Sequence, residues 1–160
     1  MDQPDFKRAR ILIVDDQEQN VRLLERLLDV ADFTNVASTT DSAQAITLCA
    51  ELEPDLILLD LHMPQPDGFE VLGMLDPWIR GSTRLPVIVL TADNKRETKM
   101  RALSLGASDF LGKPFDTSEV VLRIENHLLT RLLQLELRHQ NKSLESRVRE
   151  RTRDLEEARA

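Results

Sequence analysis

Four short apolar runs in this sequence each lead into a side chain that could bind a cation or an anion. The side chains are Asp15 and Asp16 after residues 11–14, Asp60 after 56–59, Thr91 after 87–90 and Lys113 shortly after 109–111. Apolar runs of this length are typical of buried parallel strands, and ligands bind at the carboxyl ends of such strands. We therefore expect these five side chains to gather at one edge of a sheet, as a small site for a divalent metal and a phosphoryl group.

The chemistry of such a site follows from its charges. Three carboxylates held together repel one another, so one of them takes up a proton unless a cation intervenes. Mg²⁺ prefers oxygen ligands and keeps several waters, which suits Asp15, Asp16 and Asp60. An aspartate oxygen could then attack phosphorus in line, with the Lys113 ammonium and the Thr91 hydroxyl on the remaining phosphoryl oxygens. An acidic edge that binds Ca²⁺, or no ion, is the alternative, and it leaves Lys113 and Thr91 unexplained.

Helix-like segments alternate with the apolar runs over the first 129 residues, a pattern that predicts a parallel βαβ sheet. The first connecting elements expected are a helix over 21–31, a short strand near 35–37 and a helix over 42–52 that Pro54 stops. A short helix that ends near Pro77 is expected after the turn-rich residues 63–68. The last of these elements is a helix over 93–105 that Gly106 closes. Trp78 is interpreted as a packing residue on the surface.

Residues 117–160 contain neither Pro nor Gly, so one helix could run from Thr117 to the last residue. Asp116 is placed to cap it, with Glu119 three residues later as in a capping box. Phe115 and Val120 stand where a hydrophobic staple would place them. A helix of this length extends beyond a compact domain of this size, so its distal half must be solvated or paired with another helix.

The distal half of this helix carries a partial heptad repeat. Its a and d positions are Leu137, Asn141, Leu144, Val148, Arg151 and Leu155. This pattern favours a parallel dimeric coiled coil, in which a polar Asn at a fixes the register. A frayed single helix is the alternative.

Composition excludes several classes of protein. With 41% hydrophobic and 31% charged residues, the chain of 160 residues is expected to be globular. No apolar stretch approaches the roughly 20 residues that span a bilayer, and the polar N-terminus lacks a secretion signal, so no membrane partner is expected. The single cysteine, Cys49, is interpreted as a buried small hydrophobe and fits a cytoplasmic protein.

Charge is distributed unevenly along the chain. The net charge is −7, yet from residue 130 onward eight Lys/Arg stand against six Asp/Glu, so the first 129 residues carry −9. A segment this acidic is poorly suited to bind a nucleic-acid backbone, and the tail is not basic enough to do so. We therefore expect no direct binding of nucleic acid.

Taken together and in this order, the site residues resemble the receiver domain of two-component response regulators. The matching residues are Asp15-Asp16, Asp60 with Met63-Pro64 and Asp67-Gly68, Thr91-Ala92, Gly106-Ala107 and Lys113-Pro114-Phe115. The resemblance covers residues 9–129 and implies the CheY-like, flavodoxin-type (βα)5 fold of the α/β class, with a five-stranded parallel sheet. Residues 130–160 would then be a long C-terminal helical extension, the linker or coiled coil that leads to an output domain.

The resemblance also implies the roles of the acidic residues. Asp60 would be the phosphoacceptor. Asp15, Asp16, Asp60 and the backbone carbonyl of His62 would bind Mg²⁺, or Mn²⁺ in its place. Lys113 would pair with the phosphoryl group, and its peptide bond to the next residue is expected to be cis.

Thr91 and three variable positions are expected to modulate the response. Thr91 would be the switch hydroxyl, and Phe110 would take the position of the switch aromatic, with a plain core phenylalanine as the alternative. His62 and Asp93 stand two residues past Asp60 and Thr91, where receivers tune the lifetime of the acyl phosphate; the sequence gives no direction for that effect. A solvent-facing His62 imidazole is favoured over a metal ligand.

The output surface of many receivers is the α4-β5-α5 face, formed by their fourth helix, fifth strand and fifth helix. Asp109, Glu119 and Arg123 match ion pairs of receivers that dimerise through that face, with ordinary solvated charges as the alternative. A homodimer is therefore expected. The phosphoryl donor would be a sensor histidine kinase or a phosphotransfer protein.

The segment 144–156 resembles helical linkers that precede output domains in signalling proteins. HD-GYP cyclic-di-GMP phosphodiesterases, diguanylate cyclases and histidine kinases all use such linkers, and HD-GYP is favoured by analogy. Because the chain ends inside this segment, we expect it to be part of a longer protein, and any enzymatic output to lie outside it. The chain itself would catalyse only its own phosphorylation and dephosphorylation.

Two other functions are the alternatives. A haloacid-dehalogenase-like phosphatase also uses an Asp nucleophile, Mg²⁺, a Thr and a Lys, but it carries a second Asp two residues after the nucleophile, where this chain has His62. A receiver that serves only as a phosphorylation-independent scaffold would not need the intact set of Asp15, Asp16, Thr91 and Lys113.

Overall fold

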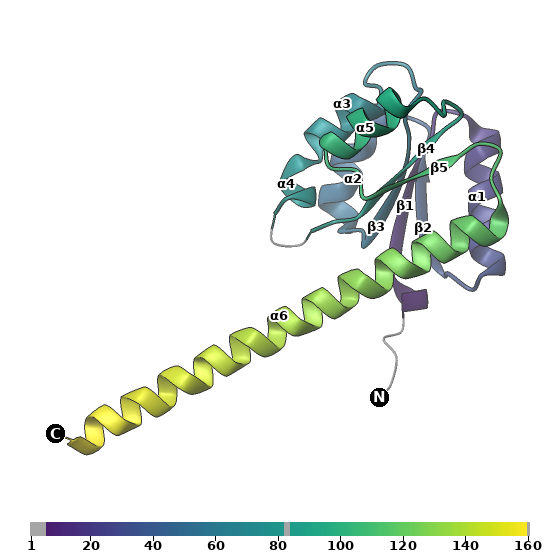
Figure 1. Ribbon diagram of the computed structural model, residues 1–160. Helices are drawn as coiled ribbons and strands as arrows, with labels where there is room; N and C mark the ends of the chain where they lie inside the picture. Colours follow the sequence, from purple (N-terminus) through teal and green to yellow (C-terminus); the bar gives the residue numbers. More distant parts are fainter. Residues whose placement is uncertain (1–5, 82–83, 160) are drawn as a thin grey trace.

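Five parallel strands form the central sheet of the structure, a computed structural model that describes residues 6–81 and 84–159. The strands are β1 (Arg10–Val14), β2 (Asn35–Thr39), β3 (Leu56–Asp60), β4 (Val87–Thr91) and β5 (Asp109–Gly112). Their order across the sheet is β2-β1-β3-β4-β5, with helices on both faces (Figure 1). The predicted α/β fold with a flavodoxin-type parallel sheet is therefore confirmed.

The register of the sheet brings the functional ends of the strands level with one another. In β3, Asp60 pairs with Leu90 of β4, one residue before Thr91. Thr91 in turn pairs with Gly112 of β5, one residue before Lys113. All residues of β3 and β4 are buried, as the uninterrupted apolar runs predict for strands covered on both faces.

Two helical layers cover the sheet. The helical elements are η1 (Phe6–Arg8), α1 (Glu18–Val30), η2 (Ser42–Gln44), α2 (Ala45–Leu52), α3 (Gly68–Met74), α4 (Asp76–Ile79), α5 (Arg96–Ser104) and α6 (Thr117–Arg159). Helices α1 and α6 pack on one face, where Leu24 and Ile124 join an apolar cluster with Ile13 and Leu58. Helices α2, α3, α4 and α5 pack on the opposite face.

The second face contains the single cysteine and the single tryptophan of the chain. Cys49 in α2 is fully buried, and burial raises the pKa of its thiol to about 11. Trp78 in α4 is half-buried against the same apolar cluster. The structure thus confirms Cys49 as a buried hydrophobe and Trp78 as a packing residue at the surface.

Three helix boundaries differ from the sequence-based expectation. The predicted helix over 42–52 begins as the 3-10 turn η2, and the helix expected from residue 93 begins at Arg96. The helix expected to end near Pro77 instead ends at Met74, and Pro77 lies in the first turn of α4. Proline is tolerated there because the first backbone N–H groups of a helix have no partner within it. The prediction that one short helix extends to near Pro77 was therefore wrong.

Helix α6 is continuous over 43 residues, through the boundary proposed at residues 129 and 130. Its start is capped as predicted, since the Asp116 carboxylate accepts hydrogen bonds from the backbone N–H groups of Ser118 (3.0 Å) and Glu119 (3.4 Å). Arg131, 8% exposed, is the last buried residue in the described part of the chain, and the helix then projects away from the sheet (Figure 1).

The projecting part of α6 keeps its apolar side chains in solvent. The exposed fractions are 65% for Leu137, 58% for Leu144, 56% for Val148 and 64% for Leu155. These are the predicted a and d positions, so an apolar stripe lies uncovered along this helix in a single copy of the chain.

None of the helices in the described part of the chain is both long enough and apolar enough to span a bilayer.

Candidate functional site

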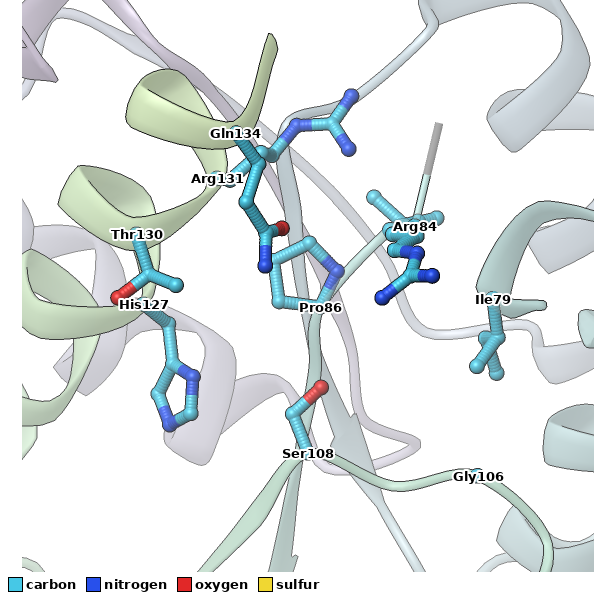
Figure 2. A pocket seen from close by; sticks show the side chains of 10 residues that line it. Ile79, Arg84, Pro86, Gly106, Ser108, His127, Thr130, Arg131 and Gln134 are labelled. Atoms are coloured by element: carbon cyan, nitrogen blue, oxygen red, sulfur yellow. The ribbon is translucent and has the colours of Figure 1, made fainter. Parts of the chain in front are cut away.

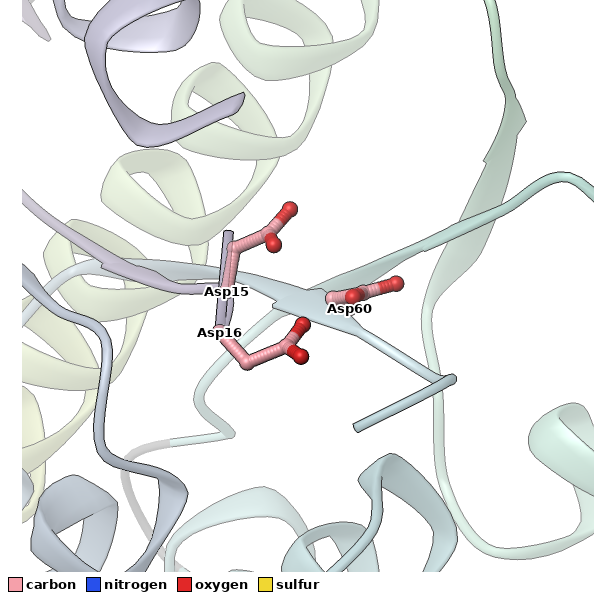
Figure 3. A group of neighbouring side chains, drawn as sticks. All are labelled: Asp15, Asp16 and Asp60. Atoms are coloured by element: carbon pink, nitrogen blue, oxygen red, sulfur yellow. The ribbon is translucent and has the colours of Figure 1, made fainter. Parts of the chain in front are cut away.

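The carboxyl ends of β1, β3, β4 and β5 place the predicted polar side chains together at one edge of the sheet. Asp15 and Asp16 follow β1, Asp60 ends β3, and one carboxylate oxygen from each lies within 4.8 Å of the others. Figure 3 shows these three side chains beside one another. Lys113, just beyond β5, extends to the same point, since its Nζ lies 3.1 Å from Asp60 Oδ1 and 3.5 Å from Asp15 Oδ2.

Burial makes these charges interact strongly. Asp15 is fully buried and Asp60 is 2% exposed. Burial, and then the nearby Asp15 carboxylate, raises the pKa of Asp60 to about 6, although the Lys113 ammonium acts in the opposite direction. One ammonium is thus insufficient to balance the carboxylates, and the site favours an additional cation.

The residues present fit a hard divalent cation. Asp15 Oδ2 and Asp16 Oδ1 are buried oxygens with no hydrogen-bond partner. Buried carboxylate oxygens that accept no hydrogen bond are costly unless they coordinate an ion, and oxygen donors are the ligands that Mg²⁺ prefers. Asp15 Oδ1 is already occupied, because it accepts a hydrogen bond from the backbone N–H of Gln17 at 2.9 Å.

Thr91 is buried at the end of β4 and is held by two neighbours. Its Oγ1 accepts a hydrogen bond from the backbone N–H of Asp93 at 2.9 Å and lies 3.2 Å from Nε2 of His62. The exposed His62 ring therefore rests against the hydroxyl rather than facing only solvent as expected. The sequence alone offers no sign of this contact, because the loop after β3 sets the direction of the imidazole.

Asp93 is itself fixed by the start of α5. Its carboxylate accepts hydrogen bonds from the backbone N–H of Lys95 (2.9 Å) and from Thr98 Oγ1 (2.7 Å). These two hydrogen bonds lower the pKa of Asp93, so it is held as an anion near the His62 imidazole. His62 and Asp93, predicted as a pair that modulates the reaction, thus both lie next to the Thr91 hydroxyl.

The loop between β3 and α3 approaches the end of β3 too closely for any side chain at Gly68. A Cβ atom there would lie 2.4 Å from Leu61 Cα and 2.5 Å from the Asp60 carbonyl oxygen. The next turn is capped by Asp67, whose carboxylate accepts the backbone N–H of Glu70 at 2.9 Å. The sequence Asp67-Gly68 therefore keeps this loop against the strand that carries Asp60.

The peptide bond between Lys113 and Pro114 is cis, as the resemblance implies, and so is the bond between Gln65 and Pro66. Phe110, in β5, is half-buried and packs on the apolar cluster of the second face. Its ring also lies 4.6 Å from the ammonium of Lys99 in α5.

The residues predicted for a dimer face lie away from the acidic site. Arg123 Nη1 is 3.3 Å from Asp109 Oδ2, and its Nη2 is 3.9 Å from Glu119 Oε1. His127 Nε2 is a further partner of Asp109, at 3.0 Å, which sequence analysis missed. His127 follows Arg123 by four residues on the same helix, and this spacing was the available indication that both could reach one carboxylate.

Comparison with known protein families agrees with this geometry. Residues 11–125 match the family described as the response regulator receiver domain. The chain is 42% identical over 137 residues to the response regulator PleD of Caulobacter vibrioides. It is 35% identical over 135 residues to the regulatory protein AtoC of Escherichia coli. Each alignment covers 84% of this chain but only 29% of PleD and 28% of AtoC, so the chain spans less than a third of these relatives.

Solved structures of response regulators also superimpose on this chain. A two-component response regulator of the LuxR family from Aurantimonas superimposes with a TM-score of 0.69 at 29% identity, covering 78% of this chain and 87% of that one. The receiver domain of Francisella response regulator 1452 gives a TM-score of 0.68 at 27% identity, covering 78% and 99%.

Proposed function

Since this chain belongs to the response regulator receiver domain family, we propose that it accepts a phosphoryl group on Asp60 from a sensor histidine kinase or a phosphotransfer protein. The observation that carries this proposal is the arrangement around Asp60. A buried carboxylate lies 3.1 Å from an ammonium and beside two carboxylate oxygens that have no hydrogen-bond partner.

The Asp60 carboxylate is the nucleophile of the proposed reaction. One of its oxygens forms a bond to phosphorus while the bond between phosphorus and the donor imidazole nitrogen breaks, and that nitrogen takes up a proton. The Lys113 ammonium, within contact distance of Asp60, stabilises negative charge on the phosphoryl oxygens. Mg²⁺, or Mn²⁺, held by Asp15, Asp16, Asp60 and the backbone carbonyl of His62, would neutralise the charge between the carboxylate and the incoming phosphoryl group.

Thr91 links the acceptor to the rest of the domain. Its hydroxyl faces His62 and the backbone of Asp93, and we expect it to turn toward a phosphoryl oxygen when Asp60 is modified. Phe110 then repacks on the apolar cluster that it shares with α5. This supports a switch that acts through α5, β5 and α6, the elements that correspond to the α4-β5-α5 face of other receivers.

His62 and Asp93 are proposed to set the lifetime of the acyl phosphate. The exposed imidazole rests on the Thr91 hydroxyl at the mouth of the site, where a water molecule must enter to hydrolyse the phosphoryl group. Asp93 holds this region in place through its bonds to the first turn of α5. The imidazole would therefore slow hydrolysis by limiting access of water.

The output of this unit is proposed to be a homodimer. Asp109, Glu119 and Arg123 form exposed or half-buried ion pairs on one face, and these could exchange partners with a second copy. The exposed stripe from Leu137 to Leu155 would pair with the same stripe of that copy as a parallel coiled coil. We place the protein in the cytoplasm.

The output domain itself is proposed to follow α6. The chain covers less than a third of its relatives PleD and AtoC, which supports a further domain in the whole protein. An HD-GYP phosphodiesterase is favoured, with a diguanylate cyclase or a histidine kinase as the other candidates, because α6 resembles the linkers of those proteins.

A phosphodonor assay tests the proposed function. The purified protein is incubated with acetyl phosphate and Mg²⁺, and its intact mass is measured over time. We expect one phosphoryl group per chain, no modification when EDTA removes the metal, and none in Asp60→Asn. Asp29→Asn, a change of an exposed carboxylate in α1, is the matched control and should be modified normally.

The same assay separates the two alternative functions. A scaffold that does not depend on phosphorylation would gain no mass under any of these conditions. A phosphatase would release phosphate through many turnovers without accumulating a modified chain. Either result would contradict the proposal.

A further inference from the structure

A cavity lies at the opposite end of the sheet from Asp60, beside residues 127–134 of α6. It has a volume of about 280 Å³ and lies between α6, the residues that lead into β4 and β5, and α4 (Figure 2). The residues that matter for its chemistry are Ile79, Arg84, Ser108, His127, Arg131 and Gln134. None of the predicted site residues lines it.

The described residues that line this cavity include basic and polar side chains, although the protein as a whole is acidic. They include two arginines, a histidine, an amide and two hydroxyls but no carboxylate, whereas the whole chain has 28 acidic against 21 basic residues. Two of these groups are fixed by acidic partners outside the lining. His127 is 3.0 Å from Asp109, and the buried Arg131 is 3.4 Å from Asp55. These contacts hold both side chains in place and offset their charge, so Arg84 is the lining cation that faces a ligand.

Arg84 is an unusual member of the lining. Its φ of 45° lies in the left-handed region, which a residue with a side chain rarely adopts. Such conformations gather at binding sites, where the surrounding structure maintains them. Figure 2 shows its guanidinium at the cavity, beside Pro86 and across from the Gln134 amide. The Arg84 side chain is exposed, so it is available to a ligand.

We propose that this cavity binds a compact oxyanion, a small phosphate ester or a small carboxylate, with the Arg84 guanidinium as its main contact. A guanidinium presents a planar fork of donors that matches the oxygens of either group. The volume is at the small end of ligand pockets, which suits a compact ligand. Ile79 and Leu85 leave room for a short apolar part beside the anion.

Occupation of this cavity would connect two parts of the switch. One wall belongs to α6, through His127 and Gln134, and the other leads into β4 and β5 through Pro86 and Ser108. A bound anion would therefore hold residues 127–134 of α6 against strands β4 and β5. The opposite ends of these strands lead to Thr91 and Lys113. This would give α6 a second input, independent of Asp60.

Titration with inorganic phosphate, and separately with succinate, tests this site in the full chain. The Asp60→Asn variant is used in EDTA, so that the acidic site and its metal do not contribute. Binding is measured by calorimetry, and backbone amide shifts in NMR spectra locate it. We expect shifts at Arg84, Ser108 and Gln134, and an affinity about tenfold or more weaker in Arg84→Gln, because a charge-assisted hydrogen bond is lost.

Arg22→Gln is the matched control, since Arg22 forms an exposed ion pair with Glu18 on α1, away from the cavity. It should bind both anions as Asp60→Asn alone does. Binding of phosphate alone would identify a phosphate site, and binding of both would identify a general oxyanion site. The inference is overturned if neither anion binds, if Arg22→Gln weakens binding as much as Arg84→Gln, or if the shifts lie around residue 60.

Discussion

The acidic site should destabilise the metal-free protein, and Asp60→Asn should therefore increase its stability. The folded protein holds Asp60 between the buried Asp15 and a single ammonium, and burial and the Asp15 charge raise the pKa of Asp60 to about 6. The amide of Asn has nearly the same shape and no charge. The variant thus removes an unfavourable buried charge while it leaves the surrounding packing unchanged.

The magnitude follows from the difference between folded and unfolded pKa values. An ordinary Asp has a pKa of 3.8 and Asp60 in the folded chain has a pKa of about 6, a difference equivalent to at most about 3 kcal/mol. Partial access of water through the mouth of the site reduces this figure, and we expect about 1–3 kcal/mol. For a chain of this size the variant should melt roughly 3–10 °C higher.

The same pKa difference determines how the stability of the wild-type protein changes with pH. Below the unfolded pKa, Asp60 is protonated in both states and has no effect on stability. Between about pH 4 and pH 6 the folded state binds more protons than the unfolded state, so the wild-type protein loses stability as the pH rises. Above about pH 6 the destabilisation is complete and constant. The advantage of Asp60→Asn should therefore appear as the pH rises through this window.

Urea unfolding in EDTA, at several values between about pH 4 and pH 7.5, measures this difference. Asp29→Asn, in an exposed position, is the control and should follow the wild type. Added Mg²⁺ should stabilise the wild type and reduce the gap. A variant that is no more stable than the wild type at neutral pH, or whose advantage does not change with pH, would refute this account of the site.

Three further predictions concern other parts of the molecule. His62→Ala should shorten the lifetime of the acyl phosphate several-fold, measured as loss of the phosphoryl mass after the donor is removed; a longer lifetime would reject the imidazole as a barrier to water. Leu144→Arg should abolish self-association in sedimentation velocity without altering the melting of the sheet, whereas Leu23→Arg, an exposed leucine of α1, should associate normally. Cys49, with its pKa raised to about 11 by burial, should resist alkylation at neutral pH until the chain unfolds; fast labelling of the folded protein would show that α2 opens readily.

The positions of Asp60 and Thr91 could be predicted because they depend on the sheet alone. Asp60 and Thr91 end buried apolar runs, and parallel strands bring their carboxyl ends to one edge whatever the loops do. The helical nature of α6 was equally accessible, since no residue interrupts it over 43 residues. In both cases a local pattern determines the structure.

Contacts between distant elements could not be predicted in this way. The approach of His62 to Thr91 depends on the path of the loop after β3, and the pairing of Arg131 with Asp55 joins residues far apart in the chain. The division between α3 and α4 depends on packing around Leu75, which is fully buried. The cavity beside Arg84 likewise forms only when α6 lies against the start of β4 and β5, so no single segment of the sequence indicates it.

Mapping the modified residue tests the central claim most directly. The protein is phosphorylated with acetyl phosphate and Mg²⁺, reduced with borohydride, which converts an aspartyl phosphate to homoserine, and digested for peptide mass spectrometry. We predict homoserine at position 60 and unmodified aspartate at positions 15 and 16. Homoserine at another carboxylate, or no modified peptide from a folded protein in the presence of Mg²⁺, would contradict the assignment of Asp60 as the phosphoacceptor.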